Sequence, residues 1–369
     1  SELQHTWEHC LAVAHEVQST LLMIGILPTI RQCDLNLDHI SPRNRYFALN
    51  EQILRARGGR PLRVDIAGRE HLRLEHHDVM LEAATTSFQL HLQAPADRIG
   101  RYFNASALVS APLVAASANS PFLFGKDLWD ETRIPLFEQA VDTGDEPPFD
   151  RKRVTFGRRY VEDPLEPFEE NLACYPVLLP LECDDPTSLP HLRLHNGTIW
   201  RWNRMLIGFD EARRPHLRVE HRVLPAGPSV IDMIANAAVY LGAVHFLACL
   251  HRPPERDLPF ETARANFYAA ARDGLGARLE WLAGAHTDAG SLMLDEVLPM
   301  ASEGLRQLEI DAADRDRYLE VVAARVRSGQ TGAAWQRARA ERNGRDLFGL
   351  VADYLEHQRS GMPVHEWEV

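Results

Sequence analysis

Polar and apolar residues alternate through residues 85–93, which predicts a β-strand with two chemically different faces. Positions 88, 90 and 92 are Phe, Leu and Leu, so one face is apolar. Gln89 and His91 project from the opposite face. We therefore expect a strand whose buried side supports the core and whose other side carries groups able to bind a ligand.

A second strand with the same alternation is predicted at residues 216–224. Its apolar positions are 217, 219 and 223, while Glu220 and Arg222 lie on the polar face. If the two strands belong to one sheet, these two charged groups project into the same cleft as Gln89 and His91. The plainer alternative is that both polar faces are solvated, with Glu220 and Arg222 forming a surface pair of little energetic value.

Helical periodicity occupies both ends of the chain. The expected elements of the first half are helices at residues 1–20, 42–57 and 97–118 and a hairpin at residues 62–74. Ser229 is a predicted N-cap with Asp232 three residues on. The chain from 229 to 369 is expected to be helical, with helices near residues 258–283, 291–308, 313–327 and 344–359.

The middle of the chain has a different character. Residues 142–190 are rich in Pro, Asp and Glu and lack periodicity, so we expect a lid or a set of substrate loops. Residues 191–224 are predicted to form strands. Mixed helices and strands, followed by a helical C-terminal third and without regular βαβ alternation, predict an α+β fold.

Composition narrows the class of protein. The 369 residues include 45% hydrophobic and 25% charged residues, as in globular proteins. A formal net charge of −12 disfavours a general nucleic-acid-binding surface, so anionic substrates need a local basic pocket. The five widely spaced cysteines argue against a disulfide framework or a structural zinc site. With no apolar run of about 18 residues and no signal-peptide pattern, we expect a cytoplasmic protein without a membrane span.

The residue types on the predicted polar face suit a metal–phosphate site. Imidazole and carboxylate groups are ligands for Mg²⁺ or Mn²⁺. The planar guanidinium of arginine binds phosphate or carboxylate with two parallel hydrogen bonds. Magnesium combined with phosphate points to a nucleotide.

Five short motifs occur in a fixed order along the chain. They are Pro42-Arg43-Asn44-Arg45-Tyr46, Phe88-Gln89-Leu90-His91, Ala118-Asn119-Ser120-Pro121, Asn196-Gly197-Thr198-Ile199-Trp200 and Val219-Glu220-His221-Arg222. Their order and spacing resemble the type 2 glutamate–cysteine ligase family, carboxylate–amine ligases related to glutamine synthetase. The resemblance covers essentially the whole chain, and residues 361–367 resemble the tail of one branch of that family.

The resemblance implies a single catalytic domain over residues 1–369, with an antiparallel sheet curved into a glutamine synthetase-like saddle and helices behind it. It implies ATP and Mg²⁺ (or Mn²⁺) on the concave face. ATP would phosphorylate the side-chain carboxylate of glutamate, and an amine such as cysteine would displace the phosphate, the reaction that begins glutathione biosynthesis. His91 and Glu220 match the family's metal ligands, and Arg222 matches the arginine that holds the γ-phosphate or the acyl phosphate.

Four further residues are candidates for binding the nucleotide or the substrate. Gln89 would orient substrate or metal-bound water, and Thr198 and Arg204 lie beside the strand expected to flank the nucleotide. Arg153 belongs to a basic cluster at residues 151–159 that would clamp phosphates from the lid. Each has a structural alternative: the basic cluster is equally well explained as solvated, and the neighbouring tryptophans as packing.

Two other groups of residues are open to more than one interpretation. Asn119 and Ser120 either line the cleft or merely end the preceding helix. The run Glu75-His76-His77-Asp78, with Glu82, resembles a metal site by composition but matches no motif of the family.

The chain departs from the family pattern at its start. Family members begin with a strand that bears paired glutamates, whereas the first residues here form a predicted helix. We expect an N-terminally incomplete domain; the alternative is a protein that has lost part of its metal site.

Three functions remain to be compared. They are a ligase, a non-catalytic nucleotide-binding or regulatory relative, and a metallohydrolase, which is disfavoured because no His-Glu-x-x-His helix occurs. The amine acceptor cannot be read from the sequence, and a homo-oligomer is possible.

Overall fold

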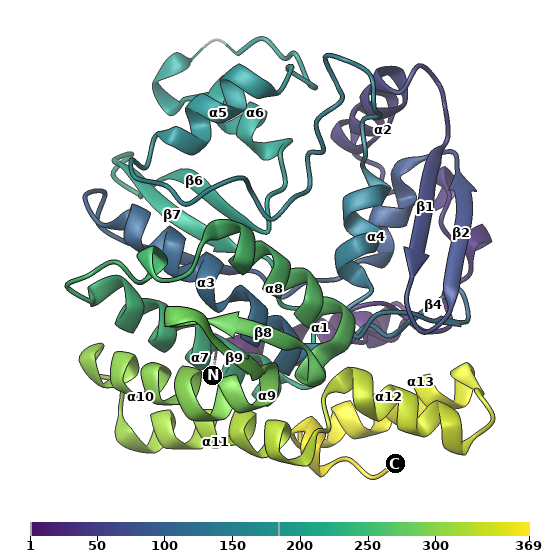
Figure 1. Ribbon diagram of the computed structural model, residues 1–369. Helices are drawn as coiled ribbons and strands as arrows, with labels where there is room; N and C mark the ends of the chain where they lie inside the picture. Colours follow the sequence, from purple (N-terminus) through teal and green to yellow (C-terminus); the bar gives the residue numbers. More distant parts are fainter. Residues whose placement is uncertain (1, 184) are drawn as a thin grey trace.

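The computed structural model describes residues 2–183 and 185–369. Its central sheet has three antiparallel strands in the order β3 (Leu90–Gln93), β7 (Pro215–His221) and β6 (Asn203–Phe209) (Figure 1). The two strands that the sequence pattern suggested could share a sheet are therefore direct neighbours. The α/β fold with antiparallel strands and a helical C-terminal region is confirmed.

One face of this sheet is apolar because the alternating residues of its strands pack on two long helices. These are α3 (Ile99–Ser117) and α7 (Val230–Cys249), which also pack against each other. Met205 on β6 and Val219 on β7 are 1% and 0% exposed within this core. The opposite face carries His91, Glu220 and Arg204, as expected from the period of two.

Three two-stranded sheets complete the strands. The first is the predicted hairpin, β1 (Leu62–Ala67) with β2 (His71–His76), and α4 (Arg133–Ala140) packs on β1. Burial alternates strictly along β1, which shows that its apolar positions face the core. The others are β4 (Phe122–Leu123) with β5 (Lys126–Asp127), and β8 (Arg278–Trp281) with β9 (Ala285–Asp288).

The C-terminal helices are α8 (Phe260–Asp273), α9 (Ala289–Leu292), the π-helical turn Met293–Val297, α10 (Leu298–Gln307), α11 (Ala312–Ser328), α12 (Gly332–Arg342) and α13 (Leu347–Ser360). Among them, α10 and α11 pack against α7, α8 packs against α3, and α12 packs against α13 beside them (Figure 1). Gly242 and Gly304 let α7 and α10 approach closely, because a Cβ on Gly304 would collide with the carbonyl group of Gly242. The predicted N-cap of α7 is confirmed, since Ser229 and Asp232 form a reciprocal capping box.

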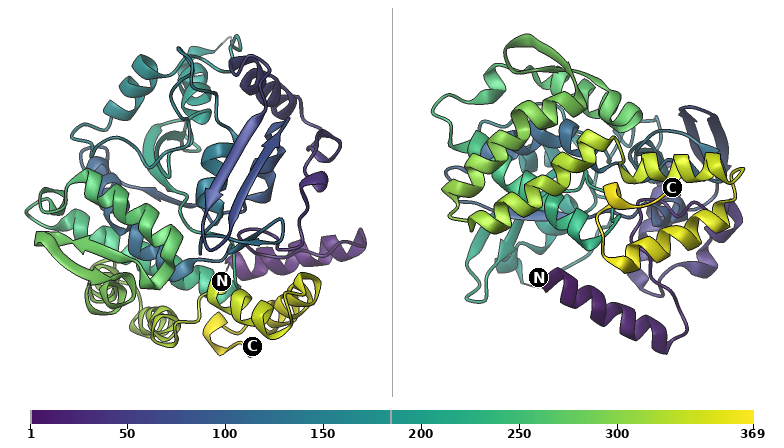
Figure 2. Two further views of the ribbon diagram at one scale, coloured as in Figure 1. Left: turned by 45° about the vertical axis from the view of Figure 1, so that its right-hand side comes forward. Right: turned by 90° about the horizontal axis from the view of Figure 1, so that it is seen from below.

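The remaining helices lie nearer the surface. They are α1 (Glu2–Glu16), α2 (Asn44–Ala56), α5 (Glu166–Cys174) and α6 (Pro190–Gly197), with short helical turns η1 (Gln32–Asp34), η2 (Leu37–His39), η3 (Val79–Ala84), η4 (Pro186–Ser188), η5 (Pro254–Arg256), η6 (Gly274–Gly276), η7 (Leu282–Gly284) and η9 (Val364–Glu366). Figure 2 shows α1 at the periphery, where Ala14 is its buried residue.

Several predicted elements were wrong in type or extent. Residues 190–197 form α6, not a strand, because Pro190 can occupy the first turn of a helix and Leu192 packs into the core. The region 142–190 contains α5 and η4. The strand expected over 85–93 is regular at Leu90–Gln93, and before it Ser87 forms an isolated bridge with Pro225. The helix expected over 258–283 was wrong in extent, since α8 ends at Asp273 and the hairpin β8–β9 follows. Helix α12 lies in the region expected to be helical but had no predicted range of its own.

Helix α7 corrects another expectation. By length and composition it could cross a membrane, with a mean hydropathy of 1.6 over its most apolar window. In the structure, 61% of that window is buried inside the protein, where α7 packs against α3, α10 and α11. Its apolar character is accounted for by its central place in the core.

Candidate active site

Three polar residues lie side by side across the central sheet. His91 on β3 is paired with Glu220 on β7, and Glu220 is paired with Arg204 on β6. Directly paired residues of neighbouring strands project from the same face. Arg222 follows two residues after Glu220 and extends the row. We call His91, Arg204, Glu220 and Arg222 the polar-face cluster.

Glu220 is the centre of this cluster and is 3% exposed. Its Oε2 accepts hydrogen bonds from Nε of Arg204 at 2.7 Å and lies 2.6 Å from Nη2 of the same residue. Arg204 also donates to backbone carbonyls at the C-terminal end of α6, including Asn196 at 3.2 Å and Ile199 at 3.3 Å. Arg204 therefore joins the carboxylate to the end of α6, where a positive charge is favourable.

The other carboxylate oxygen of Glu220 is less engaged. Its Oε1 lies 3.9 Å from Nη1 of Arg222 and 4.0 Å from Nε2 of His91, both beyond hydrogen-bonding distance. Arg222 stacks over the ring of Phe137 at 5.2 Å, and its buried Nε has no hydrogen-bond partner among the described residues. Burial lowers the pKa of Arg222 to about 10, with Arg204 contributing and Glu220 opposing, so Arg222 stays charged near neutrality with unused donor capacity.

His91 is the accessible member of the cluster, with 38% of its side chain exposed. Burial lowers its pKa below the usual value, and the surrounding arginines act in the same direction against the opposing effect of Glu220. The neutral imidazole is therefore favoured near pH 7, and a neutral imidazole is the form that binds metals.

His91 and Glu220 fit a divalent cation as a pair. Nε2 of His91 and Oε1 of Glu220 lie 4.0 Å apart, and neither atom is hydrogen-bonded to another described residue. Mg²⁺ is commonly held by one or two protein ligands, with water and substrate phosphates completing its shell. Within residues 2–183 and 185–369, no group of three or more His, Cys, Asp or Glu side chains is arranged to hold a metal.

A pocket of about 370 Å³ lies next to the polar-face cluster. It is lined by residues from η2, α2, η3 and α4 together with Trp200: His39, Ile40, Ser41, Tyr46, Leu49, Val79, Met80, Glu82, Ala83, Phe137, Val141 and Trp200. Phe137 belongs to both places, since one side of its ring contacts Arg222 and it also lines the pocket. The volume falls within the range of small-molecule sites. We call this the aromatic pocket.

Two residues predicted to bind the nucleotide are instead bonded to each other inside the protein. Arg153, 1% exposed, donates from Nη1 to the carbonyl of Thr198 at 3.1 Å and to its hydroxyl at 3.2 Å. Its Nη2 donates to the carbonyl of Pro176 at 2.6 Å. Burial lowers the pKa of Arg153 to about 10. These bonds tie the region 142–190 to the segment before β6 and leave the guanidinium turned away from solvent.

The other candidate residues are distributed over several elements. Gln89 is exposed and precedes β3. Arg159 of the basic cluster is exposed and pairs with Glu166 at 3.4 Å. The Glu75–Asp78 run divides: His76 Nε2 lies 2.9 Å from Asp78, which caps η3, while Glu82 lines the aromatic pocket. The sequence pattern gave no sign that Glu82 belongs beside the polar-face cluster.

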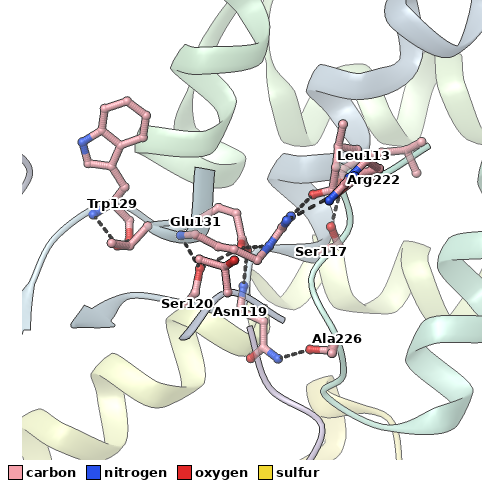
Figure 3. Close-up of polar contacts among 12 residues, drawn as sticks. Leu113, Ser117, Asn119, Ser120, Trp129, Glu131, Arg222 and Ala226 are labelled. Carbon is pink, nitrogen blue, oxygen red and sulfur yellow. Dashed lines mark hydrogen bonds and ion pairs between the residues drawn. The ribbon is translucent and has the colours of Figure 1, made fainter. Parts of the chain in front are cut away.

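Asn119 and Ser120 belong to the interior (Figure 3). Glu131, fully buried, accepts hydrogen bonds from the backbone N–H of Asn119 at 2.9 Å, from Ser120 Oγ at 2.7 Å and from Arg133 Nε at 3.0 Å. Arg133 also donates to the carbonyls of Arg222 and Val223. We call Asn119, Ser120, Glu131 and Arg133 the Glu131 network; it holds the end of α3 against the segment that carries Arg222.

Comparisons with known proteins identify the family. No curated protein matches the chain. The model of glutamate–cysteine ligase family 2 matches residues 1–348, nearly the whole chain. The match confirms the resemblance carried by the five motifs, two of which supply His91 and Glu220 to the polar-face cluster. The chain belongs to glutamate–cysteine ligase family 2.

Proposed function

We propose that this protein is an ATP-dependent carboxylate–amine ligase that joins the side-chain carboxylate of glutamate to an amine through an acyl phosphate. Membership of the family implies ligase activity of the glutamate–cysteine type. The observation that carries the proposal further is the polar-face cluster. It combines a carboxylate, a neutral imidazole and an arginine with unused donors on one sheet face.

The chemistry of phosphoryl transfer needs charge stabilisation more than a nucleophilic side chain. Arg222 is placed to supply this, because its guanidinium is held by stacking on Phe137 and its Nε has no partner among the described residues. A phosphate oxygen would satisfy that donor and gain a charge-assisted hydrogen bond. Arg204 acts indirectly in this proposal, since its bonds to Glu220 fix the direction in which Oε1 points.

His91 and Glu220 are the residues that would hold Mg²⁺ or Mn²⁺, which when bound supplies positive charge to the nucleotide phosphates. Binding would require His91 to be neutral, as its lowered pKa favours. The roles of Gln89, Thr198, Arg204 and Arg153 in nucleotide binding stay predictions. For Arg153 and Thr198 the internal hydrogen bonds support a role in positioning the chain.

ADP release tests the proposal. The full-length protein would be incubated with ATP, Mg²⁺, glutamate and a panel of amines that includes cysteine and hydroxylamine. We expect ADP release that depends on both glutamate and an amine, and a loss of about 10- to 100-fold in Glu220→Gln. Glu303→Gln on α10, a half-buried carboxylate that pairs with Arg306, serves as the control. Absence of any glutamate-dependent ADP release in the wild-type protein would refute the ligase.

A non-catalytic nucleotide-binding relative is the second candidate. It is favoured by the close pairing of Glu220 with Arg204. A carboxylate that an arginine already neutralises attracts a metal ion less strongly, and without the metal the chemistry would not proceed. The same experiment separates the two functions. Saturable ATP binding in calorimetry without ADP release would support the relative, whereas glutamate-dependent turnover would exclude it.

A further inference from the structure

The aromatic pocket has a lining with specific chemistry. Tyr46 from α2, Phe137 from α4 and Trp200, which follows α6, bring three aromatic rings to one cavity. Phe137 and Trp200 contact each other with ring centroids 6.4 Å apart. Aromatic faces carry negative charge density that attracts cations, while the rings bury apolar groups. Such walls favour a ligand that has an apolar body and a positive charge.

Glu82 is the acidic residue among the side chains that line this pocket. It lies on η3, where the neighbouring Leu81 and Ala84 are buried in the core cluster behind the β1–β2 hairpin and so direct Glu82 the other way. Within residues 2–183 and 185–369, no hydrogen bond or ion pair engages its carboxylate. Glu82 keeps solvent access through the pocket, but the protein atoms around it raise its pKa, and the charge of Arg222 only partly opposes this.

A negative charge and a positive charge lie at different places around the pocket: Glu82 lines it, and Arg222 lies outside it. Arg222 lies behind Phe137 and makes an electrostatic interaction with Glu82 without bonding to it. His39, the other titratable group of the lining besides Tyr46, is exposed, and its Nδ1 lies 2.9 Å from the carbonyl of Asp34. A ligand with an ammonium group would give Glu82 the partner that it lacks. A ligand with only negative charge would meet Glu82 unfavourably.

We infer that the aromatic pocket is the subsite for the amine acceptor, with Glu82 as the anchor of its ammonium group. The inference rests on the proposed ligase function and names the class of acceptor: a primary ammonium compound with an apolar body. Its position follows from Phe137, which lines the pocket and contacts Arg222, and from the electrostatic interaction of Glu82 with Arg222. An amine in the pocket lies next to the residue proposed to hold the acyl phosphate. Glu82 binds the ammonium group and accepts one of its protons, so that the free amine forms the C–N bond as phosphate leaves; Trp200 and Tyr46 enclose the apolar part.

A turnover experiment uses two acceptors that differ in charge. Cysteine carries an ammonium group at neutral pH, whereas hydroxylamine is small and uncharged and does not need an anchor. In Glu82→Gln we expect the KM for cysteine, or for the best ammonium acceptor of the panel, to rise about 10- to 100-fold, the effect of losing a hydrogen bond to a charged group. The rate with hydroxylamine should stay at the wild-type value. Glu75→Gln, an exposed carboxylate on β2, is the matched control.

A binding experiment tests the pocket without turnover. Benzylamine and benzyl alcohol have the same ring and differ in charge at neutral pH, so calorimetry with both isolates the contribution of the ammonium group. We expect benzylamine to bind the wild-type protein more tightly than benzyl alcohol, and this difference to disappear in Glu82→Gln and persist in Glu75→Gln.

The outcomes separate the two hypotheses. No ADP release with hydroxylamine in the wild-type protein would refute the ligase and leave the benzylamine result to decide the pocket. Equal losses with cysteine and hydroxylamine in Glu82→Gln, or benzylamine binding unchanged by that substitution, would overturn the assignment of Glu82. Selective loss of activity with ammonium acceptors, together with loss of the affinity difference between benzylamine and benzyl alcohol, would support it.

Discussion

Two carboxylate–arginine groups meet at residues 220–223 and differ in how fully they are bonded. In the Glu131 network, Glu131 receives three hydrogen bonds, and both Glu131 and Arg133 are at most 1% exposed. In the polar-face cluster, one oxygen of Glu220 is held by Arg204, while the other lies 3.9 Å from Arg222. The carboxylate of the Glu131 network is fully hydrogen-bonded inside the protein. The polar-face cluster keeps hydrogen-bonding atoms without partners, such as Nε of Arg222, beside the aromatic pocket.

This difference in bonding distinguishes charges that stabilise the fold from charges that can bind a ligand. Burial raises the pKa of Glu131 and lowers the pKa of Arg133, and each of the two is opposed by the attraction of its partner. A buried pair of this kind tolerates no loss of a partner, because the remaining charge has no access to water. The polar-face cluster can exchange partners, since His91 is exposed and Arg222 has an unused Nε. A ligand can therefore bind there without breaking the fold.

The largest expected effect is on stability. Glu131→Ala leaves Arg133 charged and uncompensated in the core, so we expect a loss of about 3–5 kcal/mol in the free energy of unfolding, measured by urea denaturation. Glu220→Ala is the matched comparison and should cost less, because Arg204 and Arg222, 9% and 8% exposed, keep some access to water, whereas Arg133 is 1% exposed. Equal losses in the two variants would contradict the distinction between the groups.

The second effect is on activity. Here the larger loss is expected in the polar-face cluster and not in the Glu131 network. Arg222→Lys keeps the charge but removes the planar fork and its stacking on Phe137. We expect kcat for glutamate-dependent ADP release to fall about 10²- to 10³-fold, while the urea midpoint changes little. Arg218→Lys, which lies further along the same face opposite Gln93, is the control and should retain most of the activity. A fall in kcat that merely follows a loss of folded protein would count against a role for Arg222.

The third effect is a pH dependence on the opposite face of the sheet. His221 is fully buried, stacks on Tyr240 at 4.2 Å and lies 2.7 Å from Asn203, and burial lowers its pKa to about 3, with Arg133 contributing. The unfolded chain binds a proton near pH 6.5, and the folded protein does so only near pH 3. Stability should therefore be complete above pH 6.5 and fall between these values, by up to about 1.4 kcal/mol per pH unit.

Urea denaturation at a series of pH values measures this dependence. His221→Gln has no imidazole to protonate, so its stability should fall less steeply between pH 6.5 and pH 5 than that of the wild-type protein. Parallel curves for the two proteins would show that other groups cause the acid sensitivity.

The smallest effect is expected at the surface. Glu303 and Arg306 form an ion pair one helical turn apart on α10, and the hydrogen bond from Arg306 lowers the pKa of Glu303 to about 2. Solvent screens this pair, so Arg306→Ala should leave the urea midpoint and the activity unchanged. A substantial loss of stability would show that bonding, rather than burial, decides the cost of removing a partner.

The sequence pattern was sufficient for the parts of this protein that depend on local order. Period-two alternation placed His91, Glu220 and Arg222 on polar faces, and the motifs indicated the family that the comparisons confirmed. The capping box of α7 and the β1–β2 hairpin also follow from neighbouring residues. These features could be predicted because the interacting groups lie within a few residues of one another.

Tertiary structure alone decided which charges have partners. Arg204 and Arg153 are alike in sequence, yet one meets Glu220 across a strand pair and the other is buried against Thr198. Glu82 enters the aromatic pocket because η3 packs beside α2 and α4, which no local pattern indicates. Alternation fixes the face on which a side chain projects, but the partner on that face comes from a segment distant in sequence. Burial and hydrogen bonding, and with them the chemistry of each charge, therefore depend on how the chain packs.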